Sequence, residues 1–187
     1  MSILTEVLPD YLVVSGKKCK IRTDFKTWLK FSEIISKNDN ETEKTIKILT
    51  LIFFELPPNL REALVAVGEF YSKEQKTSTK KGNSKNKAVF DFEYDADLIY
   101  AAFMQQYRID LCESDMHWWK FKALFNGLSE DTHFTKIVQY RGMDLSKIKD
   151  KETRAQYMKI KSAYRLPENR SEAQKEADLV SSFEKMF

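Results

Sequence analysis

The residues whose types could do chemistry are concentrated between positions 91 and 128. This stretch opens with acidic residues at four alternating positions, which is the spacing of the first ligands in an EF-hand calcium loop. They are Asp91, Glu93, Asp95 and Asp97. The match ends there, because the sixth position of the loop is Ala96 rather than glycine and the twelfth is Ala102 rather than glutamate. Charge at the start of a helix explains the acids better, and we predict that role for Asp95 and Asp97.

The same stretch holds the one nearby pair of soft ligands, Cys112 and His117. A zinc site needs four ligands, usually in two close pairs, and the other cysteine and histidine, Cys19 and His133, lack close partners. As nucleophile and base the pair is equally weak, because residues five apart on a helix do not face each other. We therefore expect a buried thiol at Cys112 and a partly buried imidazole at His117.

No phosphate-loop, dinucleotide, nucleophile-elbow or zinc-protease motif occurs in the sequence. We accordingly predict no catalytic residue, no cofactor and no metal, and we do not expect an enzyme.

Composition favours helices. Only five glycines and four prolines occur in 187 residues, and the net charge of +3 is too small to indicate a nucleic-acid binder by itself. Two cysteines far apart in the chain suit a reduced, cytosolic setting. The N-terminus lacks the pattern of a signal peptide, and the longest apolar run, 46–56, is interrupted by Lys47 and Glu55, so we expect a soluble intracellular protein without a membrane span.

The fold class that we predict is mainly α, a compact multi-helix domain with a small N-terminal β-hairpin and a flexible lysine-rich loop. The hairpin is predicted from Tyr11–Val14 and Cys19–Arg22 around a turn containing Gly16. We divide the single domain 1–187 into a hairpin lead-in (1–22), a first helical half (23–72), a flexible basic loop (73–90), a second helical half (91–166) and a C-terminal amphipathic helix (167–187).

Capping residues predict where the helices begin. Asp24 or Thr23, then Asn40 and Asn59, each precede a helical pattern in the first half. The helix from Asn40 to about Glu55 is apolar around nearly its whole circumference, which is typical of a buried helix. In the second half Ser114 is the predicted cap of a helix that contains both Trp118 and Trp119.

Two groups of apolar residues are candidates for binding a partner. Trp118 falls on the main apolar stripe and is predicted to lie in the core. Met116, Trp119 and Ala123 form a second patch on the other side of that helix, and Met116 and Trp119 are its candidates for partner binding. The C-terminal helix carries the other group, a narrow stripe that suits a helix-in-groove contact. The last three residues of this stripe in the sequence are Val180, Phe183 and Phe187.

Nucleic-acid binding is disfavoured by two observations. The lysine-rich segment 73–87 has no interleaved aromatic residue on which bases could stack. The helices joined at 127–129 resemble a helix-turn-helix in spacing, but Glu130 and Asp131 would place negative charge against the phosphates.

Several stretches together resemble the phage family named for "gene product fifteen". The resemblance rests on Thr23-Asp24-Phe25, Trp28-Leu29-Lys30-Phe31, Leu56-Pro57-Pro58 and the stretch 92–128, and it runs over nearly the whole chain. Members of this family occur in long-tailed phages and prophages of Gram-positive bacteria, with genes usually placed between those of the tail tube and tape-measure proteins.

This resemblance implies a tail assembly chaperone. Such proteins are largely helical, bind the coiled-coil tape-measure protein, help to recruit tail tube subunits and leave before the tail is complete. We expect this protein in the host bacterial cytoplasm and not in the mature virion, with self-association left open. The alternatives are a minor tail or connector protein that stays in the virion, and a helical nucleic-acid-binding regulator. The sequence determines neither the oligomeric state, nor the partner surface, nor whether a frameshifted longer product exists.

Overall fold

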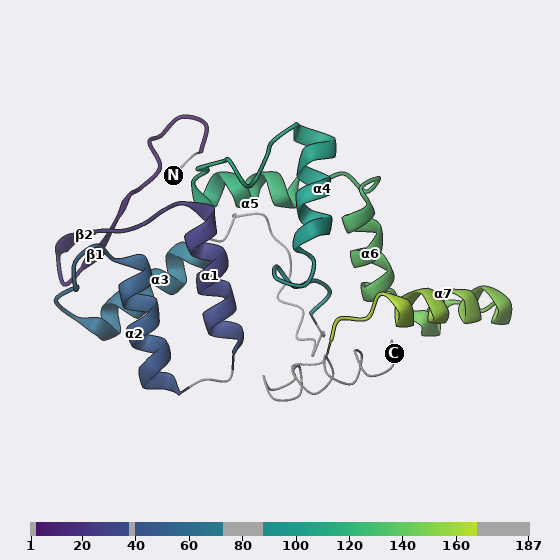
Figure 1. The fold of residues 1–187 in the computed structure, drawn as a ribbon. Coiled ribbons are helices and arrows are strands. Elements are labelled where there is room, and N and C mark those ends of the chain that lie inside the picture. Colours follow the sequence, from purple (N-terminus) through teal and green to yellow (C-terminus); the bar gives the residue numbers. More distant parts are fainter. Residues whose placement is uncertain (1–2, 38–39, 73–87, 168–187) are drawn as a thin grey trace, which may run out of the picture.

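A computed structural model describes residues 3–37, 40–72 and 88–167, and these residues form a mainly helical protein with one small hairpin (Figure 1). In chain order the elements are β1 (Tyr11–Val14), β2 (Lys17–Lys20), α1 (Phe25–Ser36), α2 (Glu41–Ile52), α3 (Leu60–Ser72), α4 (Ala96–Tyr107), α5 (Trp118–Asn126), α6 (His133–Gly142), the 3-10 helix η1 (Leu145–Lys147) and α7 (Lys151–Ala163). The predicted fold class is confirmed. Most of the predicted basic loop (73–90) and C-terminal helix (167–187) lies outside the described residues.

The hairpin follows from its turn. Strands β1 and β2 pair antiparallel with Val14 opposite Lys17, so Ser15 and Gly16 form a two-residue turn with φ of 48° and 76°. Positive φ at both positions is what a type I′ turn requires, and glycine adopts it at little cost. Ser15 is the less suitable residue, and Glu62 of α3 accepts hydrogen bonds from both its backbone N–H and its hydroxyl, at 2.8 and 2.9 Å. The hairpin is thereby fixed to the start of α3.

The three caps predicted in the first half are confirmed. Asp24 accepts a hydrogen bond from the backbone N–H of Thr27 at 2.9 Å, and Asn40 accepts one from that of Thr42 at 2.8 Å. Asn59 accepts from the backbone N–H of Glu62 at 3.2 Å. Each side chain satisfies a donor that the first helical turn leaves unpaired.

The prediction that α2 is buried on all sides is wrong. The buried residues lie on one face, which packs against α1 and α3: Ile48, Leu49 and Ile52. On the opposite side Ile46 is 58% exposed. The first half therefore leaves one side of α2 in water.

Helix α2 also ends earlier than predicted, at Ile52 rather than near Glu55. The cause is Arg22, which lies far away in the sequence. Its guanidinium donates hydrogen bonds to the carbonyl oxygens of Thr50, Leu51 and Phe53, at 3.0–3.2 Å, and so satisfies carbonyls that a helix end leaves unpaired. The chain then leaves the helix in an extended conformation at Phe53.

The predicted cap at Ser114 is also wrong, because α5 begins at Trp118 and is capped by His117. Residues 116–118 are held extended against the start of α1. The backbone N–H of Phe25 donates to the Met116 carbonyl at 2.9 Å, and the N–H of Trp118 donates to the Thr23 carbonyl at 2.7 Å. This pairing between the two halves delays the helix by one turn.

Both ring nitrogens of His117 have partners. Nδ1 accepts a hydrogen bond from the backbone N–H of Trp119 at 3.1 Å, and Nε2 lies 3.2 Å from the carbonyl oxygen of Pro9. A carbonyl can only accept, so the neutral imidazole carries its proton on Nε2. The expected partly buried imidazole at His117 is confirmed, in the role of a helix cap.

Stacked aromatic rings join the two halves of the molecule. Trp118 of α5 stacks on Tyr71 of α3 at a centroid distance of 5.2 Å and on Trp28 of α1 at 6.3 Å, and Trp28 in turn stacks on Phe70 within the first half at 4.6 Å. Their indole N–H groups donate to the carbonyls of Arg22 and Tyr71, at 2.9 and 3.2 Å, so neither buried donor is left unpaired. The predicted place of Trp118 in the core is confirmed, since it is 2% exposed.

Helix α7 extends sideways from the end of α6 (Figure 1). None of its residues is buried, and it packs on α6 and η1. Tyr157 lies 6.1 Å from Tyr140 of α6 between ring centroids, and Lys161 Nζ donates to the Met143 carbonyl at 2.7 Å. In the ranges that the structure describes, no helix is long and apolar enough to cross a bilayer.

Candidate partner-binding surfaces

Met116 and Trp119 are half-buried between the two halves of the molecule. The Trp119 indole stacks on Phe70 at 4.8 Å, and its N–H donates to the carbonyl of the same residue at 3.0 Å. Met116 packs against the core and pairs through its carbonyl with Phe25. These contacts use much of the surface that we assigned to a partner. A role of the two residues in partner binding stays a prediction, and the structure favours a surface elsewhere.

The other predicted binding residues, Val180, Phe183 and Phe187, lie outside the described residues. Their apolar stripe therefore remains a sequence-based prediction.

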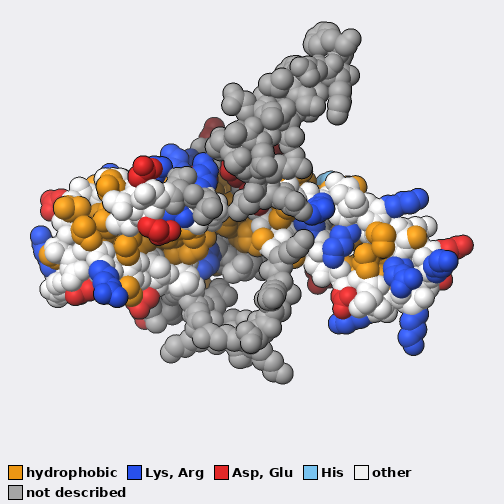
Figure 2. Space-filling view, turned by 90° about the horizontal axis from the view of Figure 1, so that it is seen from below, with side chains coloured by type: hydrophobic (Ala, Val, Ile, Leu, Met, Phe, Trp, Pro, Cys, Tyr) orange, Lys and Arg blue, Asp and Glu red, His pale blue; other side chains and the backbone are white. Residues whose placement is uncertain are grey.

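The first half displays a group of exposed apolar side chains that we did not predict as a surface. We call it the hairpin surface and define it by three exposed residues, Val13, Phe54 and Leu56, together with the half-buried Tyr11. Val13 is 57% exposed, Phe54 55% and Leu56 75%. Tyr11 and Val13 point to the same side of β1, and Phe54 is tied to the end of β2 by a hydrogen bond from its backbone N–H to the Lys20 carbonyl. Figure 2 shows hydrophobic side chains gathered over this half of the molecule.

Cations surround the hairpin surface. Lys18 Nζ lies 4.5 Å from the centroid of the Tyr11 ring, and the guanidinium carbon of Arg22 lies 4.5 Å from that of Phe54. Lys20 Nζ lies 5.8 Å from the Phe54 centroid. These cation–π contacts hold the aromatic rings in place while leaving them accessible. A partner with apolar side chains and acidic neighbours would fit this surface.

The sequence held one signal for this surface. The excess of apolar residues between Ile46 and Leu56 indicated more apolar area than one helix face can bury, and we interpreted that excess as complete burial. The structure instead exposes part of it. Exposed apolar groups of this kind are common at sites of protein interaction.

Among the residues that the structure describes, the most buried charged side chains are those of Asp95 and Arg141, which form an ion pair. Their side chains are 0% and 6% exposed, and two parallel contacts of 2.6 and 2.9 Å join guanidinium to carboxylate. Arg141 also donates to the carbonyl of Val89 at 3.2 Å and to that of Tyr164. Asp95 is the N-cap residue of α4 and Asp97 lies in its first turn, so the predicted negative charge at this helix start is confirmed. The Asp95 side chain makes no capping hydrogen bond and has the further role of pairing with Arg141.

The remaining candidates for chemistry are separated from one another. Cys112 is exposed, which contradicts the predicted buried thiol, because it lies in the loop between α4 and α5 and not on a helix. Asp91 accepts hydrogen bonds from the backbone N–H groups of Glu93 and Tyr94, at 2.9 and 2.8 Å. Within residues 3–37, 40–72 and 88–167, no three histidine, cysteine or acidic side chains are grouped to hold a metal ion.

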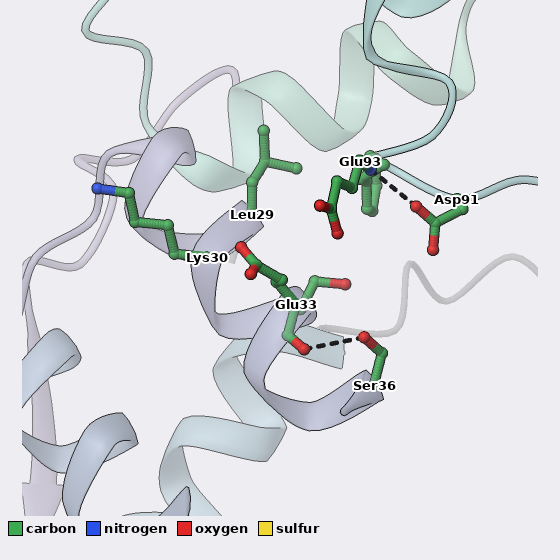
Figure 3. Close-up of a pocket in the computed structure, with 8 residues that line it drawn as sticks. Leu29, Lys30, Glu33, Ser36, Asp91 and Glu93 are labelled. Atoms are coloured by element: carbon green, nitrogen blue, oxygen red, sulfur yellow. Dashed lines mark hydrogen bonds between the residues drawn. The ribbon is translucent and has the colours of Figure 1, made fainter. Parts of the chain in front are cut away.

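A shallow groove of about 180 Å³ lies between α1 and the segment before α4. Glu33 lies on one side and Asp91 and Glu93 on the other, with Leu29 and Phe92 also lining it. Figure 3 shows Glu93 directed from its segment toward α1. Glu33 is paired with Lys37 at 2.6 Å and Asp91 is bound by backbone N–H groups, so these two carboxylates serve local structure.

Two aspartates stabilise the start of η1 and of α7. The hydroxyl of Ser146 holds the pKa of Asp144 below its usual range, and the backbone N–H of Thr153 does the same for the pKa of Asp150. A lowered folded-state pKa means that the stabilisation is present above the usual aspartate range and is lost as the pH falls through the folded pKa.

Helix α7 is therefore expected to fray in acid. As the pH falls below about 4, the amide proton of Thr153 should shift in NMR spectra together with the protonation of Asp150. Asp150→Asn is the matched control, because asparagine keeps the capping oxygen and cannot titrate. If the Thr153 amide shifts equally in Asp150→Asn, the capping carboxylate is not the cause.

The described residues form a small, mainly helical protein whose main surface features are exposed apolar and charged side chains. The chain belongs to the Bacteriophage Gp15 protein family, whose model matches residues 4–166. The resemblance to this phage family is thereby confirmed. No significant match was found among curated proteins or among solved structures.

Proposed function

We propose that this protein is a tail assembly chaperone, which binds the tape-measure protein and tail tube subunits during long-tail morphogenesis. It would act in the host cytoplasm, without catalysis, and leave before the virion matures. Membership of a phage family supports the phage context. The observation that carries the binding role is the hairpin surface, with Val13, Phe54 and Leu56 each more than half exposed.

A tape-measure protein has long helices with apolar stripes, which aggregate until the tube encloses them. A protein that keeps them soluble needs exposed apolar area that binds such stripes moderately and repeatedly. The cations beside Tyr11 and Phe54 would select stripes flanked by acidic residues. The C-terminal stripe of Val180, Phe183 and Phe187 is proposed as a second contact.

Co-expression with the tape-measure gene of the same phage tests this proposal. We expect the wild-type protein to raise the soluble fraction of the tape measure, and Phe54→Ser/Leu56→Ser to lower that fraction at least about fivefold. Ile46→Ser/Val65→Ser is the matched control, because both residues are 58% exposed but lie on helices α2 and α3. Circular dichroism verifies that each variant is folded.

Two results would contradict the proposal. A tape measure that is equally insoluble with and without this protein would exclude the chaperone role. Mass spectrometry of purified virions separates the alternative, because a minor tail or connector protein would be found in the particles and a chaperone would be missing.

A further inference from the structure

Helix α7 presents an outward face that the rest of the described chain does not cover. The sides of α7 that do not pack on α6 carry exposed charged side chains, three basic and one acidic, around an exposed methionine: Lys151, Glu152, Arg154, Met158 and Lys159. Met158 is 57% exposed. Most helices of this length depend on tertiary packing for stability, yet α7 has no buried residue. Its surface therefore suits a further contact.

Charge is strongly segregated along the second half. Residues 88–132 contain nine acids against three lysines and arginines, a net charge of −6, whereas 133–167 contain nine lysines and arginines against three acids, a net charge of +6. The Asp95–Arg141 pair neutralises one charge of each sign within the molecule. Figure 2 shows basic side chains projecting around the lobe that contains α7.

Part of the acidic excess lies in the loop between α4 and α5. This loop carries Asp110, Glu113 and Asp115, and the last two are exposed. Its backbone is held in place, since Lys26 Nζ donates to the Cys112 carbonyl at 2.7 Å and Asp110 accepts from the Cys112 N–H at 2.8 Å. The loop is at the upper edge of the molecule in Figure 1, whereas α7 is at the lower right.

We propose that copies of this protein associate head to tail, with the outward face of α7 bound to the acidic 110–115 loop of a second copy. The two faces are opposite in charge and lie apart from each other, the loop at the upper middle of the molecule in Figure 1 and α7 at its right, so one copy can use both at once with different neighbours. Such a heterologous contact builds a ring or an open chain rather than a closed symmetric dimer. This proposal is independent of the chaperone role.

A nucleic acid is the less suitable occupant of this face. Residues 88–132 next to the lobe carry a net charge of −6 and would repel a long run of phosphates, whereas the 110–115 loop presents only two exposed carboxylates, Glu113 and Asp115. An acidic protein surface can be bound by a smaller basic area than a nucleic acid requires. The 110–115 loop of a second copy is such an acidic surface.

Sedimentation velocity on the full chain tests the association. At about 0.1 mM protein the average mass should exceed that of the monomer in about 0.1 M salt and fall toward it in about 1 M salt, where the Debye length shortens from about 10 to about 3 Å. A wild-type protein that is monomeric at both salt concentrations overturns the proposal, and this result remains distinguishable from the co-expression result.

Neutral variants identify the two faces. One variant removes the positive charges of α7, Lys151→Gln/Arg154→Gln/Lys159→Gln, and the other removes the exposed negative charges of the loop, Glu113→Gln/Asp115→Asn. Each should weaken self-association at least about tenfold. Mixed in equal amounts they should form a heterodimer and nothing larger, because each retains one intact face. Two control variants change exposed charges of the first half instead: Lys17→Gln/Lys30→Gln/Arg61→Gln and Glu55→Gln/Glu69→Gln. Both should associate like the wild type.

Three outcomes would overturn the assignment of faces. They are a mixture that remains monomeric, control variants that lose association equally, and a wild-type protein that binds random duplex DNA in about 0.1 M salt while remaining monomeric. The last would assign the basic face of α7 to a nucleic acid.

Discussion

Replacing Arg141 with methionine is expected to lower the free energy of unfolding by about 3–5 kcal/mol. Methionine fills a similar apolar volume, but it leaves the Asp95 carboxylate buried without its bidentate partner. It also removes the donor to the Val89 and Tyr164 carbonyls, which position the segment before α4 and the end of α7. Urea unfolding followed by circular dichroism measures the loss.

A double variant separates the cost of the unpaired Asp95 carboxylate from the loss of the hydrogen bonds to the Val89 and Tyr164 carbonyls. Asp95→Leu/Arg141→Met removes both charges, and it should be less destabilised than the sum of the two single variants, because no unpaired charge remains. Arg61→Met is the control, since this exposed arginine of α3 should change stability by no more than about 0.5 kcal/mol. Additive single effects would mean that the pair is not coupled in solution.

Features set by neighbouring residues were predictable from the sequence. The turn at Gly16 needs positive φ, and the caps at Asp24, Asn40 and Asn59 each bind an N–H two or three residues ahead. Such signals involve only a few adjacent positions, so one sequence contains the whole interaction.

Features set by distant residues were not predictable in the same way. Helix α5 begins at Trp118 rather than after Ser114 because Thr23 and Phe25 hold the preceding residues extended. Arg141 did fall on the apolar stripe of its helix, which is unusual for a charge and could have indicated a buried partner. No local pattern connects it with Asp95, 46 positions earlier.

The surfaces that bind a partner could not be predicted from local sequence either. An apolar residue on a helix face is equally consistent with burial and with exposure to a partner, and only the packing of the other half decides. Trp119 became half-buried because Phe70 stacks on it, whereas Phe54 stayed exposed because the chain turns there toward Pro57 and α3. Partner surfaces are therefore the part of this protein least predictable from periodicity alone.

Trp118→Ala is expected to lower the free energy of unfolding by about 3–5 kcal/mol, comparable to the loss in Arg141→Met. Trp118 is 2% exposed and contacts rings from both halves, Tyr71 at 5.2 Å and Phe121 at 5.7 Å between centroids. Its removal leaves a cavity where α1, α3 and α5 meet. Because both halves lose packing at once, unfolding should remain a single cooperative transition by circular dichroism and by tryptophan fluorescence.

Trp119→Ala is the matched comparison, because it removes the same side chain one position further along. Trp119 keeps part of its surface in water, so its loss should be clearly smaller, about 1–3 kcal/mol. Equal losses in the two variants would show that Trp119 is as deeply packed as Trp118 and would remove it from the candidates for partner binding. Two separate transitions in Trp118→Ala would instead mean that the halves fold independently, contrary to the single domain predicted from the sequence.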